Sequence, residues 1–199
     1  MKRILILVLL GVVGLLLNSN VAAAMPQGKV LVAYFSRVGN EYSVGSITKG
    51  NTAIIADIIA ETTGADLFEI KPVKPYPTNY DECTKMASRE KATKARPEIT
   101  GKIENFQSYD TIFIGYPIWW GDMPMVVYTF LESYDFSGKK IVPFCTHGGS
   151  GLSSTDQAIT LACPNSRILQ GFAIRGVVAQ NNADEAKTKV KEWLSSINF

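Results

Sequence analysis

The chain has 199 residues, a length typical of one medium-sized domain with a substantial buried core. Hydrophobic residues make up 46% of it, aromatic residues 10% and charged residues 19%, which excludes a disordered, collagen-like or coiled-coil protein. The formal net charge of +2 is too small to indicate a nucleic-acid-binding protein.

The first 24 residues form a segment of their own. Lys2 and Arg3 precede an apolar run over residues 4–17, and a polar break separates that run from the alanines at 22–24. This order is typical of a secretory signal peptide cleaved near Ala24. A membrane anchor is the alternative, but the run is shorter than the roughly 20 residues that span a bilayer. We therefore expect an exported protein, periplasmic or extracellular, with no stable membrane insertion once the signal is cleaved.

The mature domain would cover residues 25–199. Signal removal lowers the number of basic residues from 20 to 18, which equals the number of acidic residues. The basic isoelectric point therefore owes much to the signal, and no nucleic-acid partner is expected. A charge near zero also argues against a strongly acidic docking face for a basic partner protein.

Three cysteines remain in the mature chain: Cys83, Cys145 and Cys163. Cys145 ends a predicted strand, and Cys163 ends the helix that returns along it. A ten-residue helix is about 15 Å long, whereas the Cα atoms of a disulfide lie within about 7 Å. We expect three buried thiols.

The first half of the domain alternates strands and helices. Residues 29–35 form an apolar run with β-branched and aromatic side chains, typical of a strand buried on both faces. After a Gly- and Ser-rich loop, residues 52–61 place isoleucines on one face of a predicted helix. Gly64 ends that helix, and residues 65–70 predict a second strand. Residues 79–91, beyond a Pro-rich loop, predict a polar helix.

The alternation continues with a third strand over residues 110–115 and a fourth over residues 139–145. Between them, residues 123–131 predict a helix with Asp122 as its N-cap and Pro124 in its first turn.

The end of the chain follows the same pattern. Ser154 and Gln157 match a capping box at the start of a helix. Residues 167–174 predict a fifth strand with a break at Gly171, and residues 183–197 predict the last helix.

Strict alternation of strands and helices predicts an α/β fold with a doubly wound parallel sheet. Five strands favour the order 2-1-3-4-5. Ligands of such sheets bind beyond the carboxyl ends of the strands, at the switch between the first and third strands. Function is therefore expected in the loops after the first, third and fourth strands.

The loop after the first strand holds Ser36, an apparent insertion over residues 41–49, and then Gly50, Asn51 and Thr52. Hydroxyls, an amide and free N–H groups at a helix start form an anion site for phosphate. The alternative is that Asn51 or Thr52 only caps the helix. A Walker-type lysine is missing from this loop, which disfavours nucleotide triphosphate hydrolysis.

The loop after the third strand contains Trp119 and Trp120 side by side. Two indoles at a ligand-binding edge suit a flat aromatic ligand, which would stack on them. The alternative is that one or both fold into the core.

The loop after the fourth strand runs from Thr146 to Gly151 and contains His147, the one histidine of the chain. Its glycines let backbone amides approach the polar edge of a ligand. A single histidine excludes a multi-histidine metal site. The His-Gly-Gly string resembles the oxyanion element of esterases, but no Gly-x-Ser-x-Gly elbow accompanies it, which disfavours a serine hydrolase. A phosphoacceptor receiver domain needs carboxylates at the ends of the first and third strands. This chain has Ser36 and Tyr116 there, which excludes that class.

Together these loops resemble the three flavin mononucleotide (FMN)-binding loops of the flavodoxin-like family. The matching segments are residues 34–37 with 50–52, residues 115–121 and residues 144–151. The second segment is similar to the bacterial branch with a Tyr-Pro-Ile-Trp-Trp-Gly loop, and the resemblance covers about residues 29–197.

The resemblance implies a set of cofactor-binding residues in each loop. Those expected at the FMN phosphate are Ser36, Asn51 and Thr52. Those expected to line the isoalloxazine ring are Pro117, Ile118, Trp119, Trp120 and Gly121. Those expected at its polar edge are Thr146, His147, Gly148, Gly149 and Ser150. The 41–49 insertion departs from the family pattern, and we expect Gly50 rather than Gly39 to close the phosphate loop.

The resemblance implies either electron transfer or NAD(P)H-dependent reduction of a small acceptor such as a quinone. An aromatic wall favours a one-electron carrier, whereas a protonated His147 near the flavin favours two-electron chemistry. We expect His147 to tune the flavin toward the reductase. The redox partner would be a protein or a small-molecule acceptor, and the alternative function is a flavin-free binding module on the same fold.

Overall fold

The protein is described by a computed structural model over residues 28–199, so the predicted signal peptide lies outside the described residues. Its main sheet is parallel, in the order β10-β8-β7-β1-β4. Numbered along the chain, this is the predicted order 2-1-3-4-5. The five strands are β1 (Lys29–Tyr34), β4 (Asp66–Glu69), β7 (Tyr109–Pro117), β8 (Lys140–His147) and β10 (Phe172–Arg175).

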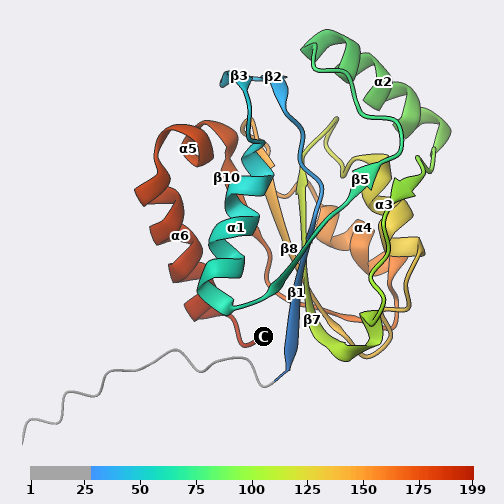
Figure 1. Cartoon of the computed structure of the whole chain (residues 1–199), viewed down its shortest axis with the longest axis vertical. Helices are drawn as coiled ribbons and strands as arrows, with labels where there is room; N and C mark the ends of the chain where they lie inside the picture. The colour runs from blue at the N-terminus through green and yellow to red at the C-terminus, as the bar shows by residue number, and fades with distance from the viewer. Residues whose placement is uncertain (1–27) are drawn as a thin grey trace, which may run out of the picture.

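Helices cover both faces of the sheet (Figure 1). On one face lie α1 (Asn51–Thr63), α5 (Gly176–Asn181) and α6 (Ala183–Ser196). On the other lie α2 (Tyr80–Thr93), α3 (Met125–Glu132) and α4 (Thr155–Ala162).

Two hydrophobic cores follow from the alternation of side chains along the strands. In β1, Val30 and Val32 belong to the core under α1 and α6, whereas Leu31 and Ala33 belong to the core under α3. A strand buried on both faces is apolar at its buried positions, which is why the run that follows Lys29 predicts it so clearly.

Smaller elements complete the chain. The predicted break at Gly171 is confirmed, because β9 (Arg167–Ile168) stops and β10 begins only at Phe172. The 41–49 insertion forms most of an antiparallel hairpin that the sequence did not predict. These small elements are β2 (Gly39–Glu41), β3 (Gly45–Ile47), β5 (Lys71–Pro72), β6 (Ile99–Thr100) and the 3₁₀ turn η1 (Phe106–Ser108).

Of three predicted helix ends, the structure confirms one and corrects two. Gly64 ends α1 in the left-handed conformation with φ 71°, as expected. Asp122 does not cap α3, because Pro124 occupies the N-cap position; the Asp122 carboxylate instead accepts from the N–H of Met123 and the hydroxyl of Tyr128. The capping box is also wrong, since Ser154 has φ 61° and its side chain makes no capping bond to the described residues.

All three cysteines are buried free thiols, as predicted. Burial raises the pKa of Cys83 and Cys163 to about 11 and that of Cys145 to about 12, so all three stay protonated at neutral pH. Within residues 28–199, no helix is long and apolar enough to cross a membrane, and no cluster of potential metal ligands occurs.

Candidate functional site

The three predicted loops meet at the carboxyl edge of the sheet, and Thr146 joins them. Its hydroxyl lies 2.9 Å from the hydroxyl of Thr52, and both side chains are buried. Its carbonyl accepts the N–H of Ile118 at 2.9 Å. One residue of the third loop therefore fixes both the helix start in the first loop and the beginning of the tryptophan loop.

The first loop closes at Gly50, as the sequence predicted. The Ser36 hydroxyl accepts the N–H of Ala53 at 3.1 Å, and a Cβ added at Gly50 would lie 2.1 Å from that hydroxyl. Only glycine allows this close approach. Gly50 is the N-cap residue of α1, so neither Asn51 nor Thr52 is the helix cap.

Asn51 lies in the first turn of α1. Its side chain lies against the start of α5, because a Cβ at Gly176 would be 2.4 Å from Asn51 Nδ2. Its Oδ1 is buried without a hydrogen-bond partner among the described residues. A buried acceptor of this kind is costly unless a ligand donor reaches it.

The tryptophan loop is a tight turn. Trp119 and Asp122 exchange two backbone hydrogen bonds, of 2.9 and 3.1 Å. Trp120 and Gly121, between them, have positive φ angles of 54° and 71°, which is the geometry of a type I′ turn. A tryptophan in this left-handed region is strained, and strained residues cluster at functional sites.

The two indoles have different surroundings. Trp119 is half-buried and meets Phe35 and Tyr76 edge-on, with ring centroids 5.4 and 4.9 Å away. Trp120 is 57% exposed, while its indole N–H donates to the Thr84 carbonyl at 3.0 Å. The pair is therefore not folded into the core: one ring is anchored and the other faces solvent.

β10 places a cation beside the third loop that the sequence analysis missed. Arg175 pairs in register with His147 across β10 and β8, and its Nη2 would lie 3.9 Å from a Cβ at Gly149. Burial first and the Arg175 charge second hold the pKa of His147 below its ordinary value. His147 is thus neutral at neutral pH, and its Nδ1 has no partner among the described residues. Arg175 is therefore a second candidate, beside His147, for tuning a ligand at this loop.

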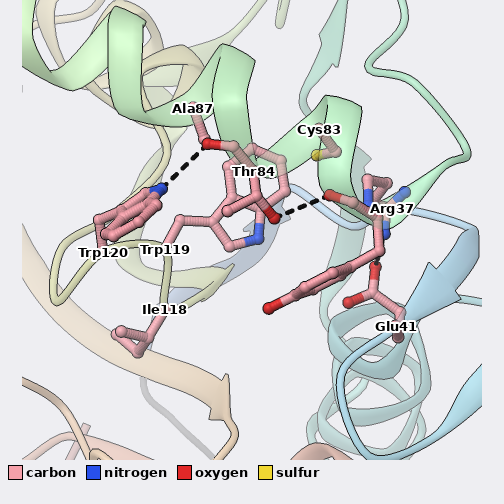
Figure 2. Close-up of a pocket in the computed structure, with 9 residues that line it drawn as sticks. Arg37, Glu41, Cys83, Thr84, Ala87, Ile118, Trp119 and Trp120 are labelled. Atoms are coloured by element: carbon pink, nitrogen blue, oxygen red, sulfur yellow. Dashed lines mark hydrogen bonds and ion pairs between the residues drawn. The ribbon is translucent and has the colours of Figure 1, made fainter.

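A cavity of about 180 Å³ lies beside the tryptophan loop (Figure 2). Its walls are α2, the residues Ile118 to Trp120, and Arg37 with Glu41. Arg37 and Glu41 form a largely buried ion pair at 2.8 Å. Burial nevertheless raises the pKa of Glu41, and the Arg37 charge offsets that effect only in part. Residues 146–150 do not line this cavity, so it adjoins the predicted ring site on the α2 side.

Comparison with known proteins agrees with this geometry. Residues 29–197 match the family model described as Flavodoxin. No curated protein sequence matches the chain. The chain belongs to the flavodoxin family.

Solved structures give the same result. A candidate flavoprotein from Bacteroides eggerthii is 31% identical, with a TM-score of 0.69, and the match covers 86% of this chain and 98% of that one. Another from Bacteroides uniformis is 33% identical, with a TM-score of 0.66, covering 82% and 98%. A flavoprotein in complex with FMN from Lactobacillus acidophilus shares the fold at 20% identity and a TM-score of 0.59, covering 73% and 93%.

The coupling between Arg175 and His147 is directly testable. Arg175→Gln removes one of the two causes that lower the pKa of His147, so that pKa should rise while burial keeps it below the ordinary value. Because the chain has one histidine, proton NMR titration follows a single imidazole. Arg167→Gln, in β9 beside the start of β8 and away from His147, is the control. An unchanged His147 titration in Arg175→Gln contradicts this account of the site.

Proposed function

We propose that this protein binds FMN and uses it to reduce a small acceptor, with NADH or NADPH as the electron donor. The observation that carries the proposal is the junction at Thr146, which brings the phosphate loop, the tryptophan loop and the glycine loop to one edge. A doubly wound sheet binds its ligand at this edge. FMN supplies the redox chemistry, and the chain binds, orients and tunes it.

The phosphate end of the cofactor fits the start of α1. The first N–H groups of a helix have no partner within it, and the helix dipole favours an anion there. Ser36 adds a hydroxyl, for which Gly50 leaves room, while the Thr52 hydroxyl is buried against that of Thr146 and helps to hold the helix start. The unpaired Oδ1 of Asn51 is an acceptor, so we assign it to a hydroxyl of the ribityl chain rather than to the phosphate.

The ring end fits the other two loops. Pro117, Ile118 and the indoles offer an apolar wall, and Gly121 belongs to the turn that presents it. Thr146 is buried and His147 half-buried, whereas Gly148, Gly149 and Ser150 are exposed, so their backbone can hydrogen-bond to a polar ring edge. The buried Nδ1 of His147 lacks a partner among residues 28–199, which fits a ligand hydrogen bond at this loop.

Two features favour a reductase over a one-electron carrier. Arg175 places a positive charge beside the glycine loop, where it would stabilise negative charge on a reduced ring. The cavity next to the indoles has room for a small molecule with one or two rings, such as a quinone. A pure carrier needs a docking surface for a protein, but no acceptor cavity.

Purified mature protein tests the proposal. We expect a yellow protein with absorption near ~450 nm, bleached under anaerobic conditions by NADH or NADPH and recoloured by a quinone. Bleaching by dithionite but not by NADH or NADPH would indicate an electron carrier and not a reductase. A colourless protein that takes up no added FMN would contradict the proposal and favour the flavin-free binding module.

We also propose that the protein acts outside the cytoplasm, on the strength of residues 1–24. The expected result is a secreted or periplasmic protein whose mass corresponds to a start near residue 25. Recovery of the full-length mass from a membrane fraction would instead indicate an uncleaved anchor.

A further inference from the structure

The cavity beside the tryptophan loop has a polar end and an aromatic end. Figure 2 shows Arg37 and Glu41 at one end, Ile118 and Trp120 at the other, and side chains of α2 along the wall between them. Its volume of about 180 Å³ exceeds the roughly 150 Å³ of a protein cavity that holds one benzene molecule. The cavity therefore fits a single aromatic ring with a polar group at one position.

The guanidinium of Arg37 is fixed by backbone oxygens. Its Nη1 donates to the carbonyls of Pro77 at 2.7 Å and Thr78 at 3.2 Å, and its Nη2 donates to the carbonyl of Asn40. Its Nε is buried and has no partner in the part of the chain that the structure describes. Because an unpaired buried donor is costly, this N–H suits an acceptor oxygen of a bound molecule.

Glu41 supplies an acceptor next to this donor. Its Oε1 pairs with Arg37 Nη2 at 2.8 Å, which leaves Oε2 for a ligand, and its side chain is 17% exposed. A hydroxyl group can accept one hydrogen bond and donate another at the same time. A hydroxyl on an aromatic ring therefore matches the polar end of the cavity, since it accepts from Arg37 and donates to Glu41.

The charges at both ends of the cavity are balanced. Of the described residues that line it, only Arg37 and Glu41 are basic or acidic, and they neutralise each other when the carboxylate is ionised. Lys91, which donates to the Trp120 carbonyl, is paired with Asp122 at 3.7 Å. A charged ligand would lose water here without gaining a free counter-charge, whereas a neutral hydroxyl would lose much less.

We propose that this cavity binds a neutral aromatic alcohol such as hydroquinone, and that Glu41 makes it select the neutral molecule over an anionic analogue. The ring lies between the tryptophan loop and α2, with its hydroxyl on Arg37 and Glu41. A quinone has a carbonyl at the same position and keeps the hydrogen bond from Arg37. The inference rests on the proposed function for one point only, namely that the bound alcohol is the reduced form of the acceptor.

Glu41→Gln tests this selection, because it removes the negative charge and keeps an acceptor oxygen at the same distance from the backbone. The ligands are hydroquinone and gentisate, which is hydroquinone with a carboxylate on its ring. Each is titrated anaerobically into the purified protein at about pH 8, where carboxyl groups are ionised, and the indole N–H NMR signals of Trp119 and Trp120 report binding. The wild type should bind hydroquinone more tightly than gentisate. In Glu41→Gln the ratio of the two dissociation constants should move toward gentisate by about tenfold or more, because Arg37 is left as an unpaired buried cation.

Glu82→Gln is the matched control. It removes the same charge from an exposed residue in the first turn of α2 that does not line the cavity. Its ratio of dissociation constants should stay within about twofold of the wild type, because salt and water screen exposed charges. Circular dichroism checks that both variants fold. Should Glu41→Gln not fold, the preference of the wild type for hydroquinone over gentisate remains the test.

The outcomes separate this inference from the proposed function. An unchanged ratio in Glu41→Gln, an equal change in Glu82→Gln, or a wild type that binds gentisate at least as tightly as hydroquinone would overturn the inference, and FMN binding would stand. Hydroquinone that shifts neither indole signal would overturn it as well. A protein that binds hydroquinone selectively but is not bleached by NADH or NADPH would keep this site and lose the proposed reductase function.

Discussion

The buried contact between the Thr52 and Thr146 hydroxyls is the constraint on which the site depends. Parallel strands bring the carboxyl ends of β1, β7 and β8 to one edge, but this alone does not fix how the loops meet. The 2.9 Å contact joins the start of α1 to the end of β8, and the Thr146 carbonyl then holds Ile118. Both threonines are almost fully buried, so an unpaired hydroxyl at either position would be costly.

The same edge holds the parts of the structure that are least favourable in isolation. Trp120 has a positive φ and an exposed indole, and Arg37 carries a buried charge whose Nε has no partner among residues 28–199. Each is stabilised by its own bonds: Trp120 by Thr84 and Lys91, Arg37 by three carbonyls and a carboxylate. Strain and buried polar atoms gathered at one rim are what a binding site preorganised for its ligand requires.

The sequence predicted the fold well because its strongest signals are local. The apolar run of β1 and the left-handed Gly64 depend on their own segments, and alternating elements restrict the sheet to few topologies. The glycine at 50 could be chosen over Gly39 because the isoleucine face of α1 begins just after it. Asp122 failed as a cap because Pro124 takes the N-cap position and the Asp122 carboxylate binds Tyr128 instead. Ser154 failed because its backbone is left-handed.

What the sequence could not predict depends on long-range contacts. Arg175 lies 28 residues from His147 along the chain and reaches it only through the pairing of β10 with β8. The hairpin meets the glycine loop, with the Tyr42 ring against Gly148, only in the folded chain. Only the three-dimensional structure brings α2 and Arg37 to the cavity beside the indoles.

The central claim is that the flavin ring lies against Trp119 and Trp120. The chain has three tryptophans, so a nitrogen–proton correlation spectrum contains three indole signals, which single Trp→Phe variants assign. Trp193 belongs to α6, where it stacks on Phe172 in the core on the other face of the sheet from Trp119. On saturation with FMN, the signals of Trp119 and Trp120 should shift strongly while that of Trp193 stays in place. Saturation that leaves both site indoles unmoved would contradict the account.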